Sequence, residues 1–289
     1  MSKLEGIYTA RDLYEDVNDL YEGKTHQQYD VGYSNLDEIF HLVKPMFVVI
    51  TGVANAGKSS FTYDMAMQLA KIHKFKFLCY SPEHSLSMNL KRLIEKYCEK
   101  PFDSFFPNRL SYDEMIGALK FIQDHFYFTD NKEETPTIKW LLDKARTCVK
   151  EFGIDSIILD PYNEISSERG NISETEHISI VISHIKRFNR ETNTITFLVA
   201  HPNKQIRDKE TGLYKVQNLM DISGSAHFNN KADAGIIVNR NPQENHTEIH
   251  ICKIRELDLM GRLGKCYMRW NDRTRCFHPL ESIIGRKHD

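Results

Sequence analysis

The chain has 289 residues, 40% of them hydrophobic, which is enough to bury the core of one large domain or of two modest ones. Its 38 basic residues nearly cancel its 40 acidic residues, so the net charge of −2 gives no sign of nucleic-acid binding and any DNA contact must come from local patches. The six cysteines form no CxxC pair, which argues against a zinc site or a disulfide framework, and no apolar run approaches the ~20 residues that span a bilayer. We therefore expect a soluble protein of the cytoplasm, without a membrane partner.

The N-terminal region predicts an isolated amphipathic helix from Ala10 to Glu22, followed by the polar stretch GKTHQQYD, which is typical of a linker. Four apolar side chains of this helix share one face, Leu13, Val17, Leu20 and Tyr21. Such a narrow face is not stable alone and needs a docking surface. We therefore divide the chain into a linker with a docking helix, residues 1–30, and a domain of residues 31–289.

The rest of the chain alternates apolar runs with helical patterns. Buried strands are predicted at Met46–Gly52, Phe75–Tyr80, Ser156–Asp160, Thr194–Ala200 and Ala234–Asn239. Helices are predicted at Lys58–His73 and near residues 84–99, 111–124, 137–152 and 173–192. Strands that alternate with long helices predict a doubly wound α/β sheet, which binds its ligand at the carboxyl ends of the strands. Period-two patterns at Thr247–Ile254 and Lys265–Trp270 predict antiparallel edge strands.

A phosphate-binding loop follows the first strand. Residues 52–59 read GVANAGKS and match GxxxxGK[ST] between a predicted strand and a predicted helix, the context that distinguishes a true P-loop from a glycine turn. Backbone amides of such a loop wrap phosphates, Lys58 reaches the terminal phosphates, and the Ser59 hydroxyl joins the Mg²⁺ shell. The predicted nucleotide-binding residues of the loop are Gly52, Asn55, Ala56, Gly57, Lys58, Ser59 and Ser60.

Two carboxylates that follow strands are candidates for the chemistry on the phosphates. Asp160 ends the third strand, where it can hold Mg²⁺ opposite Ser59; the alternative is a turn former before a proline. Glu83 follows the strand Phe75–Tyr80, which we expect to neighbour the P-loop strand, and there it can orient and deprotonate the attacking water. The alternative for Glu83 is an acid that complements a helix N-terminus.

From about Gly32 to its end, the sequence resembles the RecA-like helicase family that includes bacterial DnaB, mitochondrial Twinkle and the phage primase-helicases. Besides the P-loop, the segments that carry the resemblance are GYSNLDEIF, SPEHSLSMNLKRLI, LVAHPNK, SGSAHFNNKADAGIIVNR, KIR and LMGRLGKCYMRWN. Each segment is short and weak evidence alone. Their occurrence in the family's order after a P-loop is hard to obtain by accident. A histidine in LVAHPNK, where the DnaB branch has glutamine, points toward the Twinkle and phage side.

The resemblance implies a RecA-like P-loop fold in which residues 31–289 form a helicase motor that uses ATP and Mg²⁺. It implies that His201 senses the γ-phosphate, that Lys253 and Arg255 form a KxR element whose arginine reaches the ATP of the neighbouring subunit, and that Arg240 contacts nucleotide. The residues themselves agree, because His201 follows a buried strand and should share a sheet edge with Asp160 and Glu83. Arg255 lies in the predicted antiparallel edge region, too far along the fold to reach its own P-loop easily; the alternatives are a solvated arginine and, for His201, an ordinary hydrogen-bonded histidine.

The segment after His201 is a candidate DNA-binding loop. It holds Lys204, Arg207, Lys209 and Lys215 in a flexible sequence, and such a loop can track a phosphate backbone without reading bases. The alternative is an ordinary charged surface loop. His227 and Asn229, in the segment whose counterpart supplies a DNA-binding loop in the family, complete the predicted contacts.

Three functions fit the sequence. The first is a replicative DNA helicase that translocates on single-stranded DNA as a hexameric ring in a bacterial or phage-infected cell, with a primase as attached domain or partner protein. The second is a RecA-type or KaiC-type ATPase without unwinding activity. The third is a nucleotide-gated assembly or loading factor. The KxR element and the N-terminal helix favour the helicase, although fold alone does not separate the three.

Overall fold

The computed structural model describes residues 7–24, 27–130, 136–165, 172–202, 218–222, 225–241 and 246–280. Within these residues the strands form one nine-stranded sheet in the order β3-β2-β4-β5-β1-β6-β7-β8-β9. The strands are β1 Met46–Thr51, β2 Phe77–Tyr80, β3 Phe126–Thr129, β4 Ser156–Leu159, β5 Ile195–Val199, β6 Ala234–Asn241, β7 His246–Ile254, β8 Gly264–Asn271 and β9 Cys276–Pro279. From β3 to β6 all pairs are parallel, and from β6 to β9 all pairs are antiparallel.

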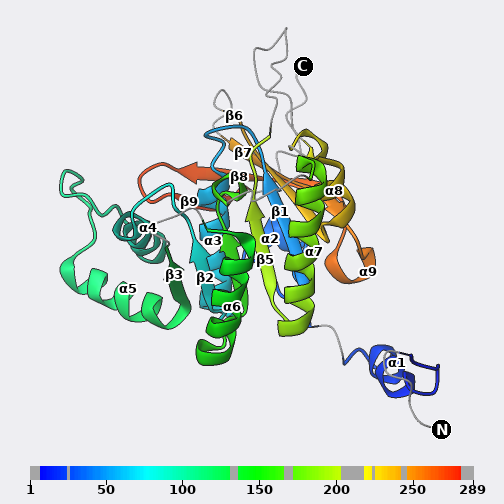
Figure 1. Ribbon diagram of the computed structural model, residues 1–289. Coiled ribbons are helices and arrows are strands. Elements are labelled where there is room, and N and C mark those ends of the chain that lie inside the picture. The colour runs from blue at the N-terminus through cyan, green and yellow to red at the C-terminus, as the bar shows by residue number, and fades with distance from the viewer. Residues whose placement is uncertain are drawn as a thin grey trace, which may run out of the picture.

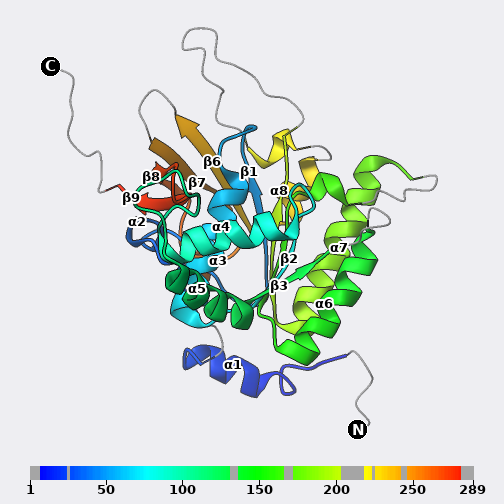
Figure 2. The ribbon, with the colours of Figure 1, turned by 90° about the vertical axis from the view of Figure 1, so that its left-hand side faces the viewer.

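Helices cover both faces of the parallel part of the sheet (Figures 1 and 2). These helices are α3 Lys58–His73, α4 Leu86–Cys98, α5 Tyr112–His125, α6 Ile138–Phe152, α7 Glu174–Thr192 and α8 Ser225–Lys231. Side chains of α3, α4 and α5 pack in one apolar cluster with alternate residues of β1 and β5, and α6, α7 and α8 pack with the other residues of the same strands. Successive residues of these strands face opposite sides of the sheet, and helices cover both sides. Every residue of such a strand is therefore buried, which explains why the strand sequences are apolar throughout. The predicted doubly wound sheet with antiparallel C-terminal edge strands is confirmed.

Local sequence fixes where the helices begin. The N-cap hydroxyls of α4, α5, α6 and α7 each accept a hydrogen bond from the amide three residues later, and these N-caps are Ser85, Ser111, Thr137 and Ser173. Ser111 and Glu114 form a complete capping box at the start of α5. Because these caps are local, the predicted helix boundaries agree with the structure within about two residues.

Two strands of the sheet, β3 and β9, were not predicted from the sequence. β3 begins at Phe126, which is also the C-cap of α5, so no turn residue separates helix from strand in the sequence FYFT. β9 is a four-residue edge strand that pairs with β8 after a short turn. Both strands are too short for an alternating pattern to identify them, and pairing with a neighbour is what makes them strands.

The N-terminal helix is shorter than expected and stands apart from the sheet. α1 runs from Tyr14 to Tyr21, has no buried residue, and lies away from the body of the molecule in Figure 1. The four side chains of its apolar face are between 40% and 89% exposed. The apolar side chains of α1 therefore receive no hydrophobic stabilisation from packing against the rest of their own chain. The division into residues 1–30 and 31–289 therefore stays a proposal, which is taken up below.

Candidate nucleotide site

The loop between β1 and α3 has a backbone that only particular residues allow. Gly52 has a φ of 147°, and a Cβ at this position would lie 2.1 Å from the carbonyl oxygen of Val238 on β6, so a side chain does not fit. Gly57 has a φ of 94° and is the N-cap of α3, while Asn55 takes the left-handed conformation with a φ of 62°. The loop thus leads directly into the N-terminus of a 16-residue helix, the end that attracts phosphate.

A cleft with an empty volume of about 860 Å³, open to solvent, lies over this loop. Predicted site residues that line the cleft are Asn55, Ala56, Gly57, Lys58, Ser59, Ser60, Glu83, His201 and Arg240. Gly52 shapes the loop beneath it, and Asp160 lines an adjoining cavity together with Ser59. The structure therefore gathers the side chains expected around the phosphates from separate segments of the chain.

Lys58 is more deeply buried than the sequence indicates. Its side chain is 4% exposed, and its ammonium donates hydrogen bonds of 2.9 Å to the carbonyl oxygens of Gly52 and Val53. Burial lowers the pKa of Lys58 to about 8, against the opposing charges of Asp160 and Glu83. The loop carbonyls thus surround its ammonium. Phosphate oxygens would offer this cation stronger acceptors than neutral carbonyls.

Ser59 and Asp160 form the second pair of the site. Ser59 Oγ donates to Asp160 Oδ1 at 3.0 Å, and Asp160 follows β4 at the same edge of the sheet as the P-loop. Burial raises the pKa of Asp160 to about 7, with a further contribution from Glu83, and the Ser59 hydrogen bond and Lys58 only partly offset this. A buried carboxylate and a hydroxyl are oxygen ligands of the kind that Mg²⁺ takes, and a cation here would stabilise the ionised Asp160. The residues present therefore fit a Mg²⁺ ion.

We expect Asp160→Asn to stabilise the protein in the absence of nucleotide and Mg²⁺ at pH 8. The pKa of the folded state lies above 3.8, so the ionised carboxylate destabilises the fold above about pH 7, and this cost disappears as the pH falls through 7 toward 4. The difference corresponds to an upper value of roughly 4 kcal/mol, and we expect about 1–3 kcal/mol. Urea denaturation with EDTA at pH 8 and pH 5.5 measures it. Equal or lower stability of the variant at pH 8 would contradict this account.

Glu83 reaches the cleft by a different route from the expected one. The strand β2 does not neighbour β1, because β4 and β5 lie between them in the sheet. The loop between β2 and α4 instead carries Glu83 over the carboxyl ends of these strands, where it lines the cleft. His201 follows β5, which does pair with β1, and its Nε2 lies 3.9 Å from Glu83 Oε1. Burial and then the charge of Lys58 lower the pKa of His201, which favours the neutral imidazole.

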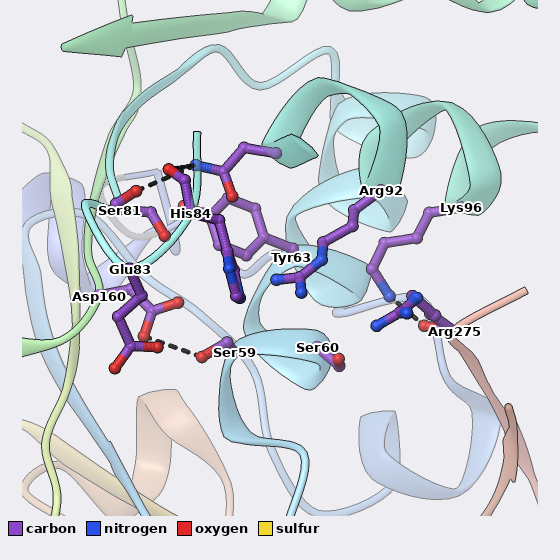
Figure 3. Close-up of a pocket in the computed structure, with 11 residues that line it drawn as sticks. Ser59, Ser60, Tyr63, Ser81, Glu83, His84, Arg92, Lys96, Asp160 and Arg275 are labelled. Atoms are coloured by element: carbon purple, nitrogen blue, oxygen red, sulfur yellow. Dashed lines mark hydrogen bonds between the residues drawn. The ribbon is translucent and has the colours of Figure 1, made fainter. Parts of the chain in front are cut away.

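Several residues at the site were not identified from the sequence. Figure 3 shows the cavity that adjoins the cleft, with Arg92 and Lys96 from α4 and Arg275 from the turn after β8 pointing toward Ser59 and Ser60 of α3. In the cleft itself the additional lining residues are His84, Arg92, Thr247, Trp270, Arg275 and Phe277. Arg92 follows Glu83 in the segment SPEHSLSMNLKRLI, so this segment could have indicated that Arg92 also lies at the site. Nothing local marks Arg275.

The KxR element lies at the opposite edge of the sheet. Ile254 on β7 pairs with Ala234, and Ala234 pairs with Val48 near the start of β1, so the following Arg255 is a strand length away from the P-loop. Arg255 Nε donates to Asp233 Oδ1 at 2.8 Å, and the Arg255 side chain is 40% exposed. Lys253 is beside it, and burial and then the charge of Arg255 lower the pKa of Lys253. Neither residue lines the cleft of its own chain.

The predicted DNA contacts are only partly within the described structure. Lys204, Arg207, Lys209 and Lys215 lie outside the described residues. His227 and Asn229 are half-buried on α8, which packs beside α7. Neither residue lines the nucleotide cleft, so these two are separated from the phosphate site.

Membrane spans and clustered metal ligands are both missing from the part of the chain that the structure describes. No helix in the described ranges is long and apolar enough to cross a membrane. Nor do those ranges contain a group of three or more His, Cys, Asp and Glu side chains arranged to hold a metal ion. The Ser59–Asp160 pair is smaller than such a group, and a Mg²⁺ ion there would draw further ligands from phosphates and water.

Comparisons with known proteins agree on one family. The DnaB-like helicase C terminal domain family matches residues 29–279. The Twinkle homolog protein, chloroplastic/mitochondrial, of Arabidopsis thaliana is 35% identical over 93% of this chain and 39% of its own length. A probable plasmid replicative DNA helicase of Chlamydia trachomatis is 23% identical over 78% of this chain and 50% of its own length. The chain thus spans half or less of these two curated relatives.

The fold comparison gives the same result. A solved structure of an isolated ATPase domain superposes with a TM-score of 0.79 at 18% identity, covering 95% of this chain and 100% of that domain. A DnaB-like replicative helicase, in a structure that describes its interactions with primase, superposes with a TM-score of 0.73 at 18% identity, covering 97% of this chain and 69% of that one. The RecA-like P-loop fold expected from the sequence is therefore confirmed.

Proposed function

Because the chain belongs to the DnaB-like helicase C terminal domain family, we propose that it is the ATP-hydrolysing motor of a replicative DNA helicase. The observation that carries this proposal is the cleft over the P-loop, which Lys58, Ser59, Glu83 and His201 line together, with Asp160 in the adjoining cavity. A cationic loop, a metal-binding pair and a carboxylate able to act as base are the parts that phosphoryl transfer to water requires.

Each residue has a role that its position supports. Lys58 exchanges its loop carbonyls for the β- and γ-phosphates, while Ser59 and Asp160 hold the metal. Bound Mg²⁺ would offset the charge of the phosphate oxygens. Glu83 orients a water molecule and accepts its proton as the water oxygen bonds to the γ-phosphorus and the bond to the β–γ bridging oxygen breaks. His201, held neutral by burial and by Lys58, donates a hydrogen bond to the γ-phosphate.

The proposal includes a hexameric ring. Arg255 lies at the end of the sheet away from its own cleft, which supports a role in the site of a neighbour. The exposed apolar face of α1 suits docking of residues 1–30 on an adjacent subunit, with residues 31–289 forming the motor. Single-stranded DNA is the proposed track, contacted through residues 201–215 and through His227 and Asn229, in a bacterial or phage-infected cell. A primase is the proposed partner.

The proposal is tested by ATP turnover with and without single-stranded DNA, together with electron-microscope images of the particles. We expect six-fold rings and a turnover that rises severalfold when DNA is added. DNA-independent turnover by particles that unwind no duplex would favour the RecA-type or KaiC-type ATPase. Nucleotide binding without turnover would favour an assembly or loading factor.

Glu83→Gln should keep ATP binding but lower turnover by roughly 10² to 10⁴, the usual size of a general-base effect. The amide keeps the shape of the side chain and removes its ability to accept a proton, so a loss at the chemical step is expected. Glu151→Gln, which makes the same change at an exposed position on α6, is the matched control. Binding of a fluorescent ATP analogue and steady-state turnover are measured for both variants. A Glu83→Gln variant that loses binding as much as turnover would assign Glu83 a structural role.

A further inference from the structure

A separate cavity opens from the nucleotide cleft on the side of α4 (Figure 3). Its empty volume is about 420 Å³, it is much smaller than the cleft, and its walls come from α3, α4, the loop after β2 and the turn after β8. Six residues line both spaces, so the two adjoin: Ser59, Ser60, Glu83, His84, Arg92 and Arg275. The cavity therefore lies directly beside the space over the P-loop.

The cavity contains a cation that lacks a close partner. Arg92 projects into it from α4 (Figure 3), and its Nε is buried without a hydrogen-bond partner among the described residues. Burying a cationic N–H donor without an acceptor costs free energy. A bound anion would supply the missing acceptor for Arg92 Nε. Lys96 differs, since its ammonium is 3.6 Å from Asp64 and also donates to the carbonyl oxygen of Arg275.

Three cationic side chains and two carboxylates line this cavity. Arg275 has a counterion in Glu95, 3.5 Å away, yet its guanidinium still acts on the groups that face it. Burial and then the charge of Arg275 lower the pKa of Arg92, and burial and then the charge of Arg92 lower the pKa of His84. The acidic groups of the cavity, Glu83 and Asp160, lie on the wall toward the P-loop in Figure 3.

We propose that this cavity binds orthophosphate, the second product of ATP hydrolysis, through Arg92 with help from Arg275 and Ser60. The proposal rests on the proposed function, which supplies both the phosphate and its position. After the bond to the bridging oxygen breaks, Lys58 stays with the β-phosphate of ADP, and the departing ion needs other cations. Arg92 presents a planar set of donors that suits phosphate oxygens, and the Ser60 hydroxyl can donate from the first turn of α3.

The test measures binding of radiolabelled orthophosphate to the full chain saturated with ADP and Mg²⁺, by equilibrium dialysis. ADP fills the P-loop up to its β-phosphate, so bound orthophosphate lies beyond it, and the arginine variants decide whether it lies in the cavity. We expect saturable binding that Arg92→Gln weakens by about tenfold or more and Arg275→Gln weakens in the same direction. Arg92→Lys should restore part of the affinity because it keeps the charge. Arg109→Gln, an exposed arginine outside the cavity, is the matched control and should bind as the unmodified protein does.

Other results would overturn the inference in distinguishable ways. Absence of saturable orthophosphate binding, or equal binding by Arg92→Gln and Arg109→Gln, would remove the product site even if ATP is hydrolysed normally. If Arg92→Gln weakens ATP as strongly as orthophosphate, Arg92 serves the γ-phosphate of the bound nucleotide and no separate site exists. A chain that binds no ADP or hydrolyses no ATP would instead fail the proposed function, and this is established first with the unmodified protein.

Discussion

Lys58→Ala is expected to abolish ATP hydrolysis. The ammonium is the only cation that the loop itself supplies to the β- and γ-phosphates, and alanine leaves those phosphates with backbone amides alone. Turnover is measured by release of phosphate from ATP, against Lys120→Ala on the exposed side of α5. Turnover of Lys58→Ala within twofold of the unmodified protein would end the P-loop interpretation.

The same variant should keep its fold in spite of the contacts of Lys58. Alanine removes two hydrogen bonds to loop carbonyls, at a cost of about 1–3 kcal/mol, but it also removes a buried cation whose pKa burial has lowered to about 8. These effects oppose each other, so the free energy of unfolding should change by less than about 2 kcal/mol. Urea denaturation without nucleotide checks that lost activity is not lost structure.

Arg255→Ala is expected to leave ATP binding almost unchanged and to lower turnover by about 10³-fold or more, the scale of arginines that act on a neighbouring site. Binding should survive because Lys58 and Ser59 remain in the cleft of the mutated chain. Nucleotide affinity and turnover are measured separately, on assemblies of verified size. A loss of affinity equal to the loss of turnover would place Arg255 outside this role.

Arg255 also forms an ion pair with Asp233, and the structure offers a control for that second role. Asp233 Oδ1 accepts hydrogen bonds from both Arg255 Nε and Lys186 Nζ, at 2.8 and 2.6 Å. If Arg255→Ala acts only by depriving Asp233 of a partner, Lys186→Ala should impair turnover to a similar degree. We expect Lys186→Ala to cost stability but less than about tenfold in turnover, because Lys186 has no proposed part in a neighbouring site.

Mixing Arg255→Ala with Lys58→Ala tests the geometry across subunits. In a mixed ring some interfaces combine an intact P-loop from the Arg255→Ala chain with an intact Arg255 from the Lys58→Ala chain. Partial turnover should therefore return, although each variant alone is inactive. If mixed rings form and remain as inactive as either variant, Arg255 acts within its own chain, and the ring mechanism loses its main support.

Much of the fold could be predicted because its determinants are local. The helix Lys58–His73 agrees with the structure at both ends, since Gly57 stops the loop and the left-handed Lys74 stops the helix. The five predicted strands exist because an apolar run of about four to eight residues must be buried, whichever neighbours it has. Burial does not reveal strand order, and for this reason the sequence suggests β2 beside β1 although β4 and β5 separate them.

The residues of the candidate site likewise fall into those that a local pattern identifies and those that only packing brings together. The phosphate loop is a contiguous stretch whose glycines, lysine and serine have roles set by spacing, so a local pattern is enough to predict a nucleotide phosphate site there. Arg92 and Arg275 are far apart in the sequence, and only the packing of α4 against the turn after β8 brings both to one cavity. Likewise, only the antiparallel pairing of β6 with β7 carries Arg255 to Asp233 and away from its own cleft. Charges from distant segments acquire partners through tertiary contacts, and no local pattern records which partner each receives.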